Sequence, residues 1–449
     1  MNQTITAIAT PHGTGSISIV RISGKDALKI ASKMVQKDPN FFKPRYAHLL
    51  NIFDNENRMV DKGIIIFFKS PNSFTGEDIV EFQTHGGVII SQILLKTILK
   101  FGGRLAEAGE FSKRAFLNGK IDLTEAEAIS SIIEAKSEEA TYQLSKQLNG
   151  ELKFFVDDIR ENLINILAYS EVTIDYAEED LPEDIEGTII ERLDEIANKL
   201  SELLSSSRRR NRVFEGFKIA IVGRPNVGKS SLLNSLLNYD RAIVSEVEGT
   251  TRDRVEEYIN IGTHLVKIVD TAGIRETENR IEKIGIEKSI EAIEEADIIL
   301  ALFDGSENLK DDDKKMIQIL NQYIDQKNIL VVLNKSDLNM VVKSIDGFKN
   351  IVISTKESSL TLVSQLEKTL NLINGTSDGG TILSSIRQID EVEKTIEAIN
   401  LAKEPLKTGE LEFFSFHINE AIERISSISK PFNYSEMLDE MFGNFCLGK

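Results

Sequence analysis

The chain of 449 residues contains one cysteine and no long hydrophobic run. A single cysteine excludes an internal disulfide and any zinc site built from several cysteines. No window approaches the roughly 18 apolar residues of a membrane-spanning helix. Residues 1–13 lack the basic start and apolar core of a signal peptide. We therefore expect a soluble, cytoplasmic protein without a membrane partner.

Basic residues are also fewer than acidic ones. The chain has 53 Lys and Arg against 71 Asp and Glu, which gives a formal net charge of −18. Such a surface repels free nucleic acid, so any work on RNA requires a local basic patch or a basic partner. The length suits about two to four domains with ample core.

The strongest motif present is a phosphate loop, Gly223–Ser230, which fits G-x-x-x-x-G-K-[ST] at every fixed position. It follows a strand-like run, Phe217–Val222, and precedes a helix-like run, Ser231–Asn238. Backbone N–H groups of such a loop curl around phosphates, Lys229 can reach the β- and γ-phosphates, and the Ser230 hydroxyl can hold Mg²⁺. The motif predicts nucleotide binding.

Further motifs follow in the order that a GTPase requires. Asp270–Gly273 ends an apolar run and can meet the Mg²⁺ shell and the γ-phosphate. Asn334–Asp337 ends another, and the Asp337 carboxylate can accept two N–H bonds from guanine. Ser354–Lys356 can close over the base, and Gly249–Asp253 has the composition of a switch loop with Thr251 on Mg²⁺. Together these motifs predict GTP as the nucleotide.

The residue that orients the attacking water is unusual. In Ras-like enzymes a glutamine after the D-x-x-G motif does this. Here the position is Ile274, which cannot orient water. Spacing alone leaves three candidates, although for any single one of them a solvated carboxylate is the simpler interpretation: Glu276, Glu278 and Glu282.

Positive charge for the transition state has more than one possible source. Arg252 and Arg275 can act as arginine fingers, or can be surface charges. Asn226, inside the phosphate loop, can offer its amide oxygen to a monovalent cation that replaces an arginine finger.

Helical patterns flank the nucleotide-binding region. Apolar residues recur at three- and four-residue spacing in Leu123–Leu148, Glu151–Ser170, Ile189–Ser206, Ser385–Leu401, Glu410–Ser429 and Tyr434–Phe442. Two polar stretches, Ser205–Arg212 and Asn374–Thr381, separate these flanks from the centre. We expect a GTPase domain inserted into one helical domain whose halves repack, rather than two helical domains. The expected boundaries are 1–119, 120–212, 213–374 and 375–449.

Two charged runs have open interpretations. The basic run Arg208–Arg212 is either a solvated hinge or a contact for RNA or a partner. The acidic run within residues 178–184 is either an exposed loop or a docking site for a basic partner.

The first ~120 residues predict a compact α/β domain. Its expected strands are Ile5–Ala9, Ser16–Ile22 and Gly63–Phe68, and its expected helices are Ala27–Val35 and Gly87–Phe101. No catalytic constellation stands out there, and His85 is better explained as a structural histidine than as a functional one.

The chain ends in Cys446-Leu447-Gly448-Lys449. A terminal lysine and the absence of a polybasic segment argue against prenylation. The cysteine is then either a reactive thiol or an idle residue.

These features together resemble the MnmE family of tRNA-modification GTPases, also called TrmE. The resemblance spans essentially the whole chain, and the central GTPase motifs with the terminal C-x-G-K make it specific. The matching segments outside the GTPase motifs are Ile8–Pro11, Val20–Gly24, Asn72–Asp78, His85–Gly87, Gly109–Asn118 and Cys446–Lys449. His12, Thr14 and Thr355 depart from the family's common residues.

The resemblance implies that the N-terminal domain binds a tetrahydrofolate carrier, as its 5,10-methylene or 5-formyl form, and builds a homodimer. Arg21, Glu81, Lys120 and Lys449 match the folate-contacting positions. Arg and Lys suit the carboxylates of the glutamate tail, and Glu suits the amino edge of the pterin. Cys446 matches a cysteine needed for modification, which favours a functional thiol.

For the GTPase domain the resemblance implies dimerisation on GTP and activation by K⁺. The expected K⁺ site comprises Asn226, Ser245, Val247 and Thr250, and the expected Mg²⁺ site comprises Ser230 and Thr251. Glu282 aligns with the catalytic carboxylate that orients the water. The residues expected to bind GTP are Asn226, Val227, Gly228, Lys229, Ser230, Ser231, Ser245, Glu246, Val247, Glu248, Gly249, Thr250, Thr251, Asp270, Thr271, Ala272, Gly273, Asn334, Lys335, Asp337, Ser354, Thr355 and Lys356.

The implied activity is shared with an FAD-containing partner, MnmG or GidA. Together they add an aminomethyl or carboxymethylaminomethyl group to C5 of the wobble uridine of tRNA. The alternative is a ribosome-assembly GTPase of the Era type. That alternative requires a basic RNA-binding appendix, which the composition lacks, and leaves the N-terminal α/β domain unexplained.

Overall fold

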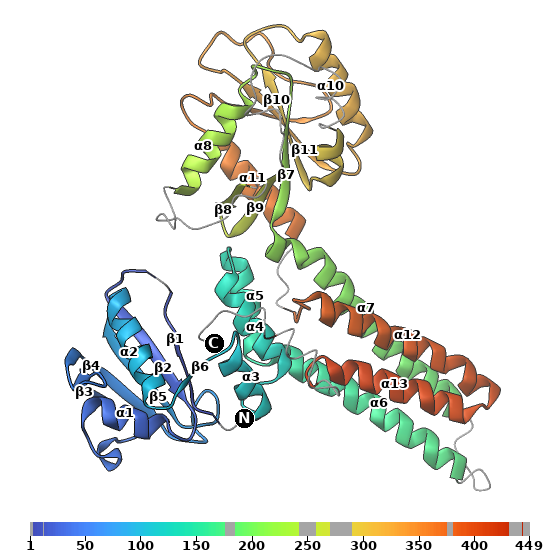
Figure 1. Ribbon diagram of the computed structural model, residues 1–449. Helices are drawn as coiled ribbons and strands as arrows, with labels where there is room; N and C mark the ends of the chain where they lie inside the picture. The colour runs from blue at the N-terminus through green and yellow to red at the C-terminus, as the bar shows by residue number, and fades with distance from the viewer. Residues whose placement is uncertain are drawn as a thin grey trace. The chain divides into compact units, whose positions relative to one another are not determined.

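A computed structural model describes residues 3–11, 13–175, 185–241, 257–269, 290–374, 380–430 and 442 (Figure 1). The chain forms two compact units. Residues 1–133, 145–201 and 385–449 form the first unit, and residues 134–144 and 202–384 form the second. None of the helices in the described ranges combines the length and apolar character that a bilayer crossing needs.

The N-terminal part of the first unit is a mixed sheet with the strand order β3-β4-β5-β2-β1-β6. Its strands are β1 (Ile5–Ile8), β2 (Ile17–Ser23), β3 (Ala47–Phe53), β4 (Met59–Phe68), β5 (Ile79–His85) and β6 (Arg104–Leu105). The helices are α1 (Ala27–Val35), α2 (Val88–Lys100) and α3 (Glu110–Leu117), with a short 3₁₀ turn at Pro39–Phe41. The expected strands and helices are confirmed to within a few residues, whereas β3, β5 and β6 were not predicted.

Alternation along the strands gives this sheet two different faces. Val20, Ile22, Val80 and Phe82 point toward α1 and α2 and form one buried core with them. The residues between them, including Arg21 and Glu81, therefore lie on the opposite face. His85 Nδ1 donates a hydrogen bond of 2.8 Å to Asp61 Oδ1 while the His85 side chain stays 76% exposed, so this histidine is paired but not buried.

The helical part corrects two of the expected elements. The segment Leu123–Leu148 is not one helix but two, α4 (Leu123–Glu134) and α5 (Glu138–Leu148). Ser137 begins the second one, because its Oγ accepts a hydrogen bond of 3.2 Å from Ala140 N, as an N-terminal cap does.

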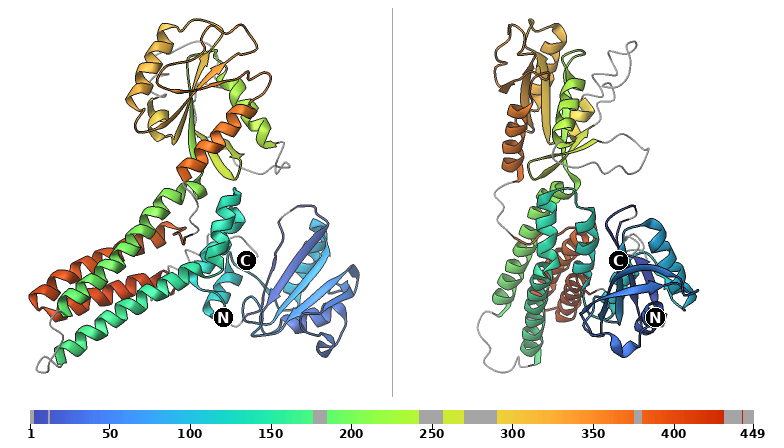
Figure 2. Two further views of the ribbon diagram at one scale, coloured as in Figure 1. Left: turned by 180° about the vertical axis from the view of Figure 1, so that it is seen from behind. Right: turned by 90° about the vertical axis from the view of Figure 1, so that its left-hand side faces the viewer.

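The polar stretch Ser205–Arg212 is not a linker or hinge, as the sequence suggested, but part of the long helix α7 (Ile185–Glu215). It contains no Gly or Pro, and arginine is a good helix former, so polarity alone does not end the helix. The remaining helices are α6 (Glu151–Asp175), α12 (Ile386–Thr408) and α13 (Leu411–Ser427), which lie alongside α7 as a bundle (Figure 2). The expected helix Tyr434–Phe442 and the acidic run at 178–184 lie outside the described residues, apart from Phe442 and its ring contact with Phe116.

A largely buried ion pair joins the two sequence halves of the helical domain. Glu127 on α4 accepts hydrogen bonds from Arg387 Nε at 2.8 Å and Nη2 at 3.0 Å, and from Gln388 Nε2 at 2.6 Å. The same guanidinium donates to Ser427 O and Ile428 O at the end of α13. Segments that lie before residue 202 and after residue 384 in the sequence therefore pack together.

Replacing Glu127 with alanine is expected to destabilise the protein by about 3–5 kcal/mol, because it leaves the Arg387 charge without its carboxylate. Urea unfolding measures the effect. The matched control is Glu397→Ala on the exposed side of α12, which is expected to change stability by less than about 0.5 kcal/mol. Equal stability of the two variants would show that this pair does not hold the halves together.

The second unit contains a mostly parallel sheet with the order β12-β11-β10-β7-β9-β8, in which only β8 runs antiparallel to its neighbour among the described strands. The strands are β7 (Phe217–Val222), β8 (Glu257–Ile261), β9 (His264–Val269), β10 (Ile298–Asp304), β11 (Asn328–Asn334) and β12 (Lys349–Val352). Helices α8 (Lys229–Arg241) and α11 (Leu360–Asn374) pack on one face, and α10 (Asp311–Gln322) packs on the other (Figure 1). Strand β7 confirms the predicted strand at Phe217–Val222, and β9 and β11 are the apolar runs that lead to Asp270 and Asn334.

Candidate functional site

The phosphate loop lies between the carboxyl end of β7 and the start of α8. Gly223 has φ +147° and Gly228 has φ +105°, which favour glycine. Neighbouring groups also leave no space for a side chain: a Cβ on Gly223 would lie 2.3 Å from Leu302 O, and one on Gly228 would lie 2.2 Å from Asn334 Nδ2. The loop is therefore shaped both by its own glycines and by β10 and β11.

Lys229 is already directed back across this loop. Its Nζ donates hydrogen bonds to Gly223 O at 2.8 Å and Arg224 O at 2.9 Å. Burial lowers the pKa of Lys229, and the nearby Arg224 charge lowers it further. Phosphate oxygens can replace the two carbonyls and stabilise the ammonium, while the N-terminus of α8, with Ser230 in its first turn, favours an anion.

Asn334 connects the phosphate loop to the expected base-binding loop. Its buried side chain donates from Nδ2 to Val227 O at 2.8 Å, and its Oδ1 accepts from Thr355 N at 3.0 Å. This amide thus uses both its donor and its acceptor to hold residues that are distant in sequence. Asn334 acts by fixing the two loops relative to each other.

Asp337 lies beside the loop at 354–356, as the sequence predicted. Ser354 Oγ donates to Asp337 Oδ1 at 2.9 Å, and Lys356 Nζ lies 3.9 Å from Oδ2. The Asp337 side chain remains 19% exposed, so its carboxylate is oriented but still reachable by a base. This geometry suits the edge of guanine that carries two N–H groups.

Lys335 takes part in an ion pair that sequence reasoning missed. It adopts φ +68°, and its Nζ lies 2.5 Å from Asp304 Oδ2 at the end of β10. Burial alone raises the pKa of Asp304, but hydrogen bonds from Lys335 and Ser306 outweigh burial and lower it. Asp304 therefore stays ionised and holds the Lys335 side chain. In the sequence, the only feature that pointed to Asp304 was its position at the end of an apolar, strand-like run.

Arg224 was also missed, because it occupies a variable position of the phosphate-loop pattern. Its Nε lies 3.1 Å from Asp313 Oδ2 on α10, and its Nη2 contacts Glu307. Asp313 is buried, so the pair fixes the loop against α10. The sequence feature that could have pointed to a partner for Arg224 is the acidic run Asp311–Asp313, which begins α10 shortly after β10.

Many of the predicted site residues lie outside the described residues. These are Ser245, Glu246, Val247, Glu248, Gly249, Thr250, Thr251, Asp270, Thr271, Ala272, Gly273, Glu282, Cys446 and Lys449, together with Ile274, Glu276, Glu278, Arg252 and Arg275. Their assigned roles stay predictions. Asn226 is described: it has φ +67° and an exposed side chain in the loop.

The N-terminal sheet brings two further predicted residues together. Arg21 and Glu81 are register partners on β2 and β5, and Arg21 Nε donates to Glu81 Oε1 at 2.9 Å. The guanidinium lies 5.7 Å from the ring centres of Phe74 and Phe111. Lys120 packs over the same loop as Phe74, since a Cβ on Gly76 would lie 3.0 Å from Lys120 Cε.

A buried network of charged side chains holds the loop that carries Phe74 and Gly76. Arg114 donates to Glu77 Oε2 at 2.9 Å and to Glu110 Oε1 at 2.8 Å. Burial raises the pKa of Glu110, but hydrogen bonds from Arg104, the Glu107 backbone and Arg114 lower it to about 2. Glu110 is therefore a permanent anion that neutralises Arg114 and keeps α3 against the loop.

The fold and the first site define a class: a phosphate-loop protein of the GTPase type, with an N-terminal α/β domain and a divided helical domain. Comparisons with known proteins extend this. The model "GTP-binding protein TrmE N-terminus" matches residues 4–120, and the model "MnmE helical domain" matches residues 123–446. The chain belongs to the MnmE (TrmE) family of tRNA modification GTPases.

Full-length relatives agree with this assignment. The tRNA modification GTPase MnmE of Aliarcobacter butzleri (strain RM4018) is 58% identical over 450 residues, covering 100% of this chain and 99% of the relative. That of Sulfurovum sp. (strain NBC37-1) is 54% identical over 451 residues, covering 100% and 99%. Among solved structures, a variant of Era from Aquifex aeolicus bound to GDP.AlF4− is 30% identical, covers 41% of this chain and 67% of its own, and has a TM-score of 0.26.

Proposed function

We propose that this chain is the GTP-hydrolysing and folate-binding half of a complex that modifies C5 of the wobble uridine in tRNA. The observation that carries the proposal is the coexistence, in one chain, of a guanine-nucleotide site and a paired Arg21–Glu81 site on a separate α/β domain. The Era-type alternative accounts for the first site only and leaves residues 4–120 unexplained.

In the GTPase site, the described residues position the nucleotide rather than react with it. Lys229 faces the β- and γ-phosphates, the backbone of the phosphate loop surrounds them, and Asp337 selects guanine. Asn334 holds these two regions at a fixed separation, so binding the base also places the phosphates. Phosphoryl transfer depends mainly on such positioning and on charge stabilisation.

Two ions are proposed at this site. Ser230 and Thr251 would hold Mg²⁺, and Asn226 with Ser245, Val247 and Thr250 would hold K⁺. Asn226 fits the second role, because its exposed amide belongs to the phosphate loop itself. When bound, these ions would supply the positive charge that the transferring phosphoryl group needs. Glu282 is proposed to orient the attacking water.

The N-terminal domain is proposed to bind the 5,10-methylene or 5-formyl form of tetrahydrofolate. Arg21 and Glu81 fit this ligand, because they are paired and partly exposed at 22% and 14%, and because the Arg21 guanidinium lies beside two aromatic rings. Lys120, and Lys449 at the end of the chain, would contribute positive charge toward the glutamate tail. Cys446 would bring a thiol to the same site.

A homodimer through this domain is part of the proposal. The sheet face opposite α1 and α2 carries exposed apolar side chains, among them Ile17 at 62%, Leu49 at 61% and Ile64 at 37% exposure. Leu49 and Ile64 are register partners, so they form one patch. We propose that a second copy covers it, that the FAD-containing MnmG (GidA) completes the complex, and that the complex acts in the cytoplasm.

Calorimetric titration of 5-formyltetrahydrofolate tests the proposal. We expect the intact protein to bind, and binding to weaken when Cys446–Lys449 are removed. Glu81→Gln is expected to weaken binding roughly 10- to 100-fold, the effect of a lost bond to a charged group. Glu56→Gln, an exposed site in the same domain, is the control. An intact protein that binds no folate would refute this half of the function.

A further inference from the structure

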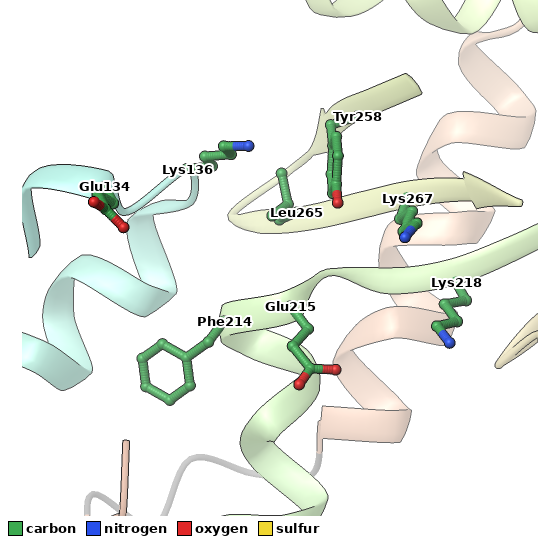
Figure 3. A pocket seen from close by; sticks show the side chains of 8 residues that line it. All are labelled: Glu134, Lys136, Phe214, Glu215, Lys218, Tyr258, Leu265 and Lys267. Atoms are coloured by element: carbon green, nitrogen blue, oxygen red, sulfur yellow. The ribbon is translucent and has the colours of Figure 1, made fainter. Parts of the chain in front are cut away.

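A cavity within the second compact unit lies away from the nucleotide site. Its volume is about 350 Å³, and it opens near the amino end of β7, whereas the phosphate loop follows the carboxyl end. Its walls come from β7, β8, β9, the end of α7 and the segment between α4 and α5 (Figure 3). Three lysines line it: Lys136, Lys218 and Lys267.

Strand register places these charges in one row. Lys218 on β7 is the partner of Lys267 on β9, which in turn is the partner of Tyr258 on β8. Register partners point to the same face, and Figure 3 shows Lys218 and Lys267 extending side by side from neighbouring strands. Lys136 Nζ lies 4.5 Å, and Lys267 Nζ 5.8 Å, from the centre of the Tyr258 ring.

Like charges directly opposite each other on neighbouring strands repel, and an anion bound between Lys218 and Lys267 would relieve that repulsion. Glu134 and Glu215 also line the cavity and offset part of the repulsion. Lysines thus outnumber glutamates among the residues that line the cavity, in a chain whose net charge is −18.

One further basic residue, Arg212 on α7, lies near this row. Arg212 Nε lies 3.1 Å from Asp297 Oδ1, and the backbone N of Lys218 donates to Asp297 Oδ2 at 2.9 Å. One carboxylate thus brings the exposed Arg212 next to the start of β7. Arg212, the last residue of the basic run whose role the sequence left open, therefore lies close to Lys218 at the start of β7.

We propose that this cavity binds a phosphate group of the tRNA backbone. RNA affinity comes largely from Lys and Arg contacts to phosphates, and an acidic protein requires a local cluster of them. Lysine ammoniums act as point charges that suit phosphate without sequence preference. The volume is large enough for a nucleotide rather than a lone ion. The inference rests on the role of the family in tRNA modification and adds a contact surface on this chain.

The test is fluorescence anisotropy of labelled tRNA with the full-length protein across a series of salt concentrations. For Lys218→Gln with Lys267→Gln we expect affinity to fall on the order of 10-fold, and the slope of log K against log[salt] to become shallower by roughly 1–2. The matched control is Lys343→Gln with Lys349→Gln, two exposed lysines elsewhere in the same unit, which removes the same charge. GTP binding by each variant checks that the unit is folded.

The results separate the possible outcomes. Equal affinity and slope in the two double variants would overturn the proposal, as would a wild-type protein that binds no tRNA. Inorganic phosphate that binds wild type, and not the Lys218/Lys267 variant, while tRNA affinity is unchanged would identify a free-anion site and also overturn it. The folate titration does not involve these lysines, so the proposed function and this inference can fail independently.

Discussion

Replacing Asp337 with asparagine is expected to weaken GTP binding by roughly 10²- to 10⁴-fold, because a site built to accept two N–H bonds loses its acceptor pair. The same variant is expected to bind xanthosine triphosphate better than wild type does. Xanthine carries a carbonyl where guanine carries the amino group, and an asparagine N–H can donate to it. Titration of both nucleotides, with fluorescent analogues as probes, measures the exchange of preference.

The structure supplies the reason for expecting a change in specificity rather than a collapse of the site. Ser354 Oγ donates to Asp337 Oδ1, and an asparagine oxygen can accept the same bond. Asp346→Asn, an exposed position in the same unit, removes the same charge and serves as the control. If Asp337→Asn kept its affinity for GTP, the base would have to be read elsewhere.

Replacing Glu282 with alanine is expected to leave GTP binding intact and to slow hydrolysis about 10²- to 10⁴-fold, the usual contribution of a positioned acid or base. Ile274 cannot orient water, so the reaction depends on another group, and the resemblance to the MnmE family assigns that role to Glu282. Single-turnover hydrolysis, measured beside nucleotide affinity, separates the two effects.

Glu278→Ala is the control for this variant, since Glu278 lies on the same segment and carries the same charge. We expect it to hydrolyse GTP at close to the wild-type rate. Normal turnover by Glu282→Ala would remove Glu282 from the mechanism, and a slow Glu278→Ala would indicate that the loss reflects the charge of the segment.

The sequence by itself determined the class of nucleotide, the combination of α/β and helical parts, and several elements around the phosphate loop. The phosphate loop and the Asn334–Asp337 motif are each one continuous stretch of sequence that follows a strand-like run. A local pattern is therefore enough to predict their chemistry. The helix α1 and the strand β7 were predicted at their observed bounds for the same reason. The local pattern failed at Ser205–Arg212. The polar residues there were interpreted as the end of a helix, whereas they continue α7.

Only the tertiary structure decided how distant residues combine. The bridge from Asn334 to Val227 and Thr355, the pairing of Arg224 with Asp313, and the pairing of Glu127 with Arg387 all join segments that no local pattern relates. The row Lys218, Lys267 and Tyr258 depends on the strand order β7-β9-β8 and on its register, because a slip of one residue would turn these side chains to the other face.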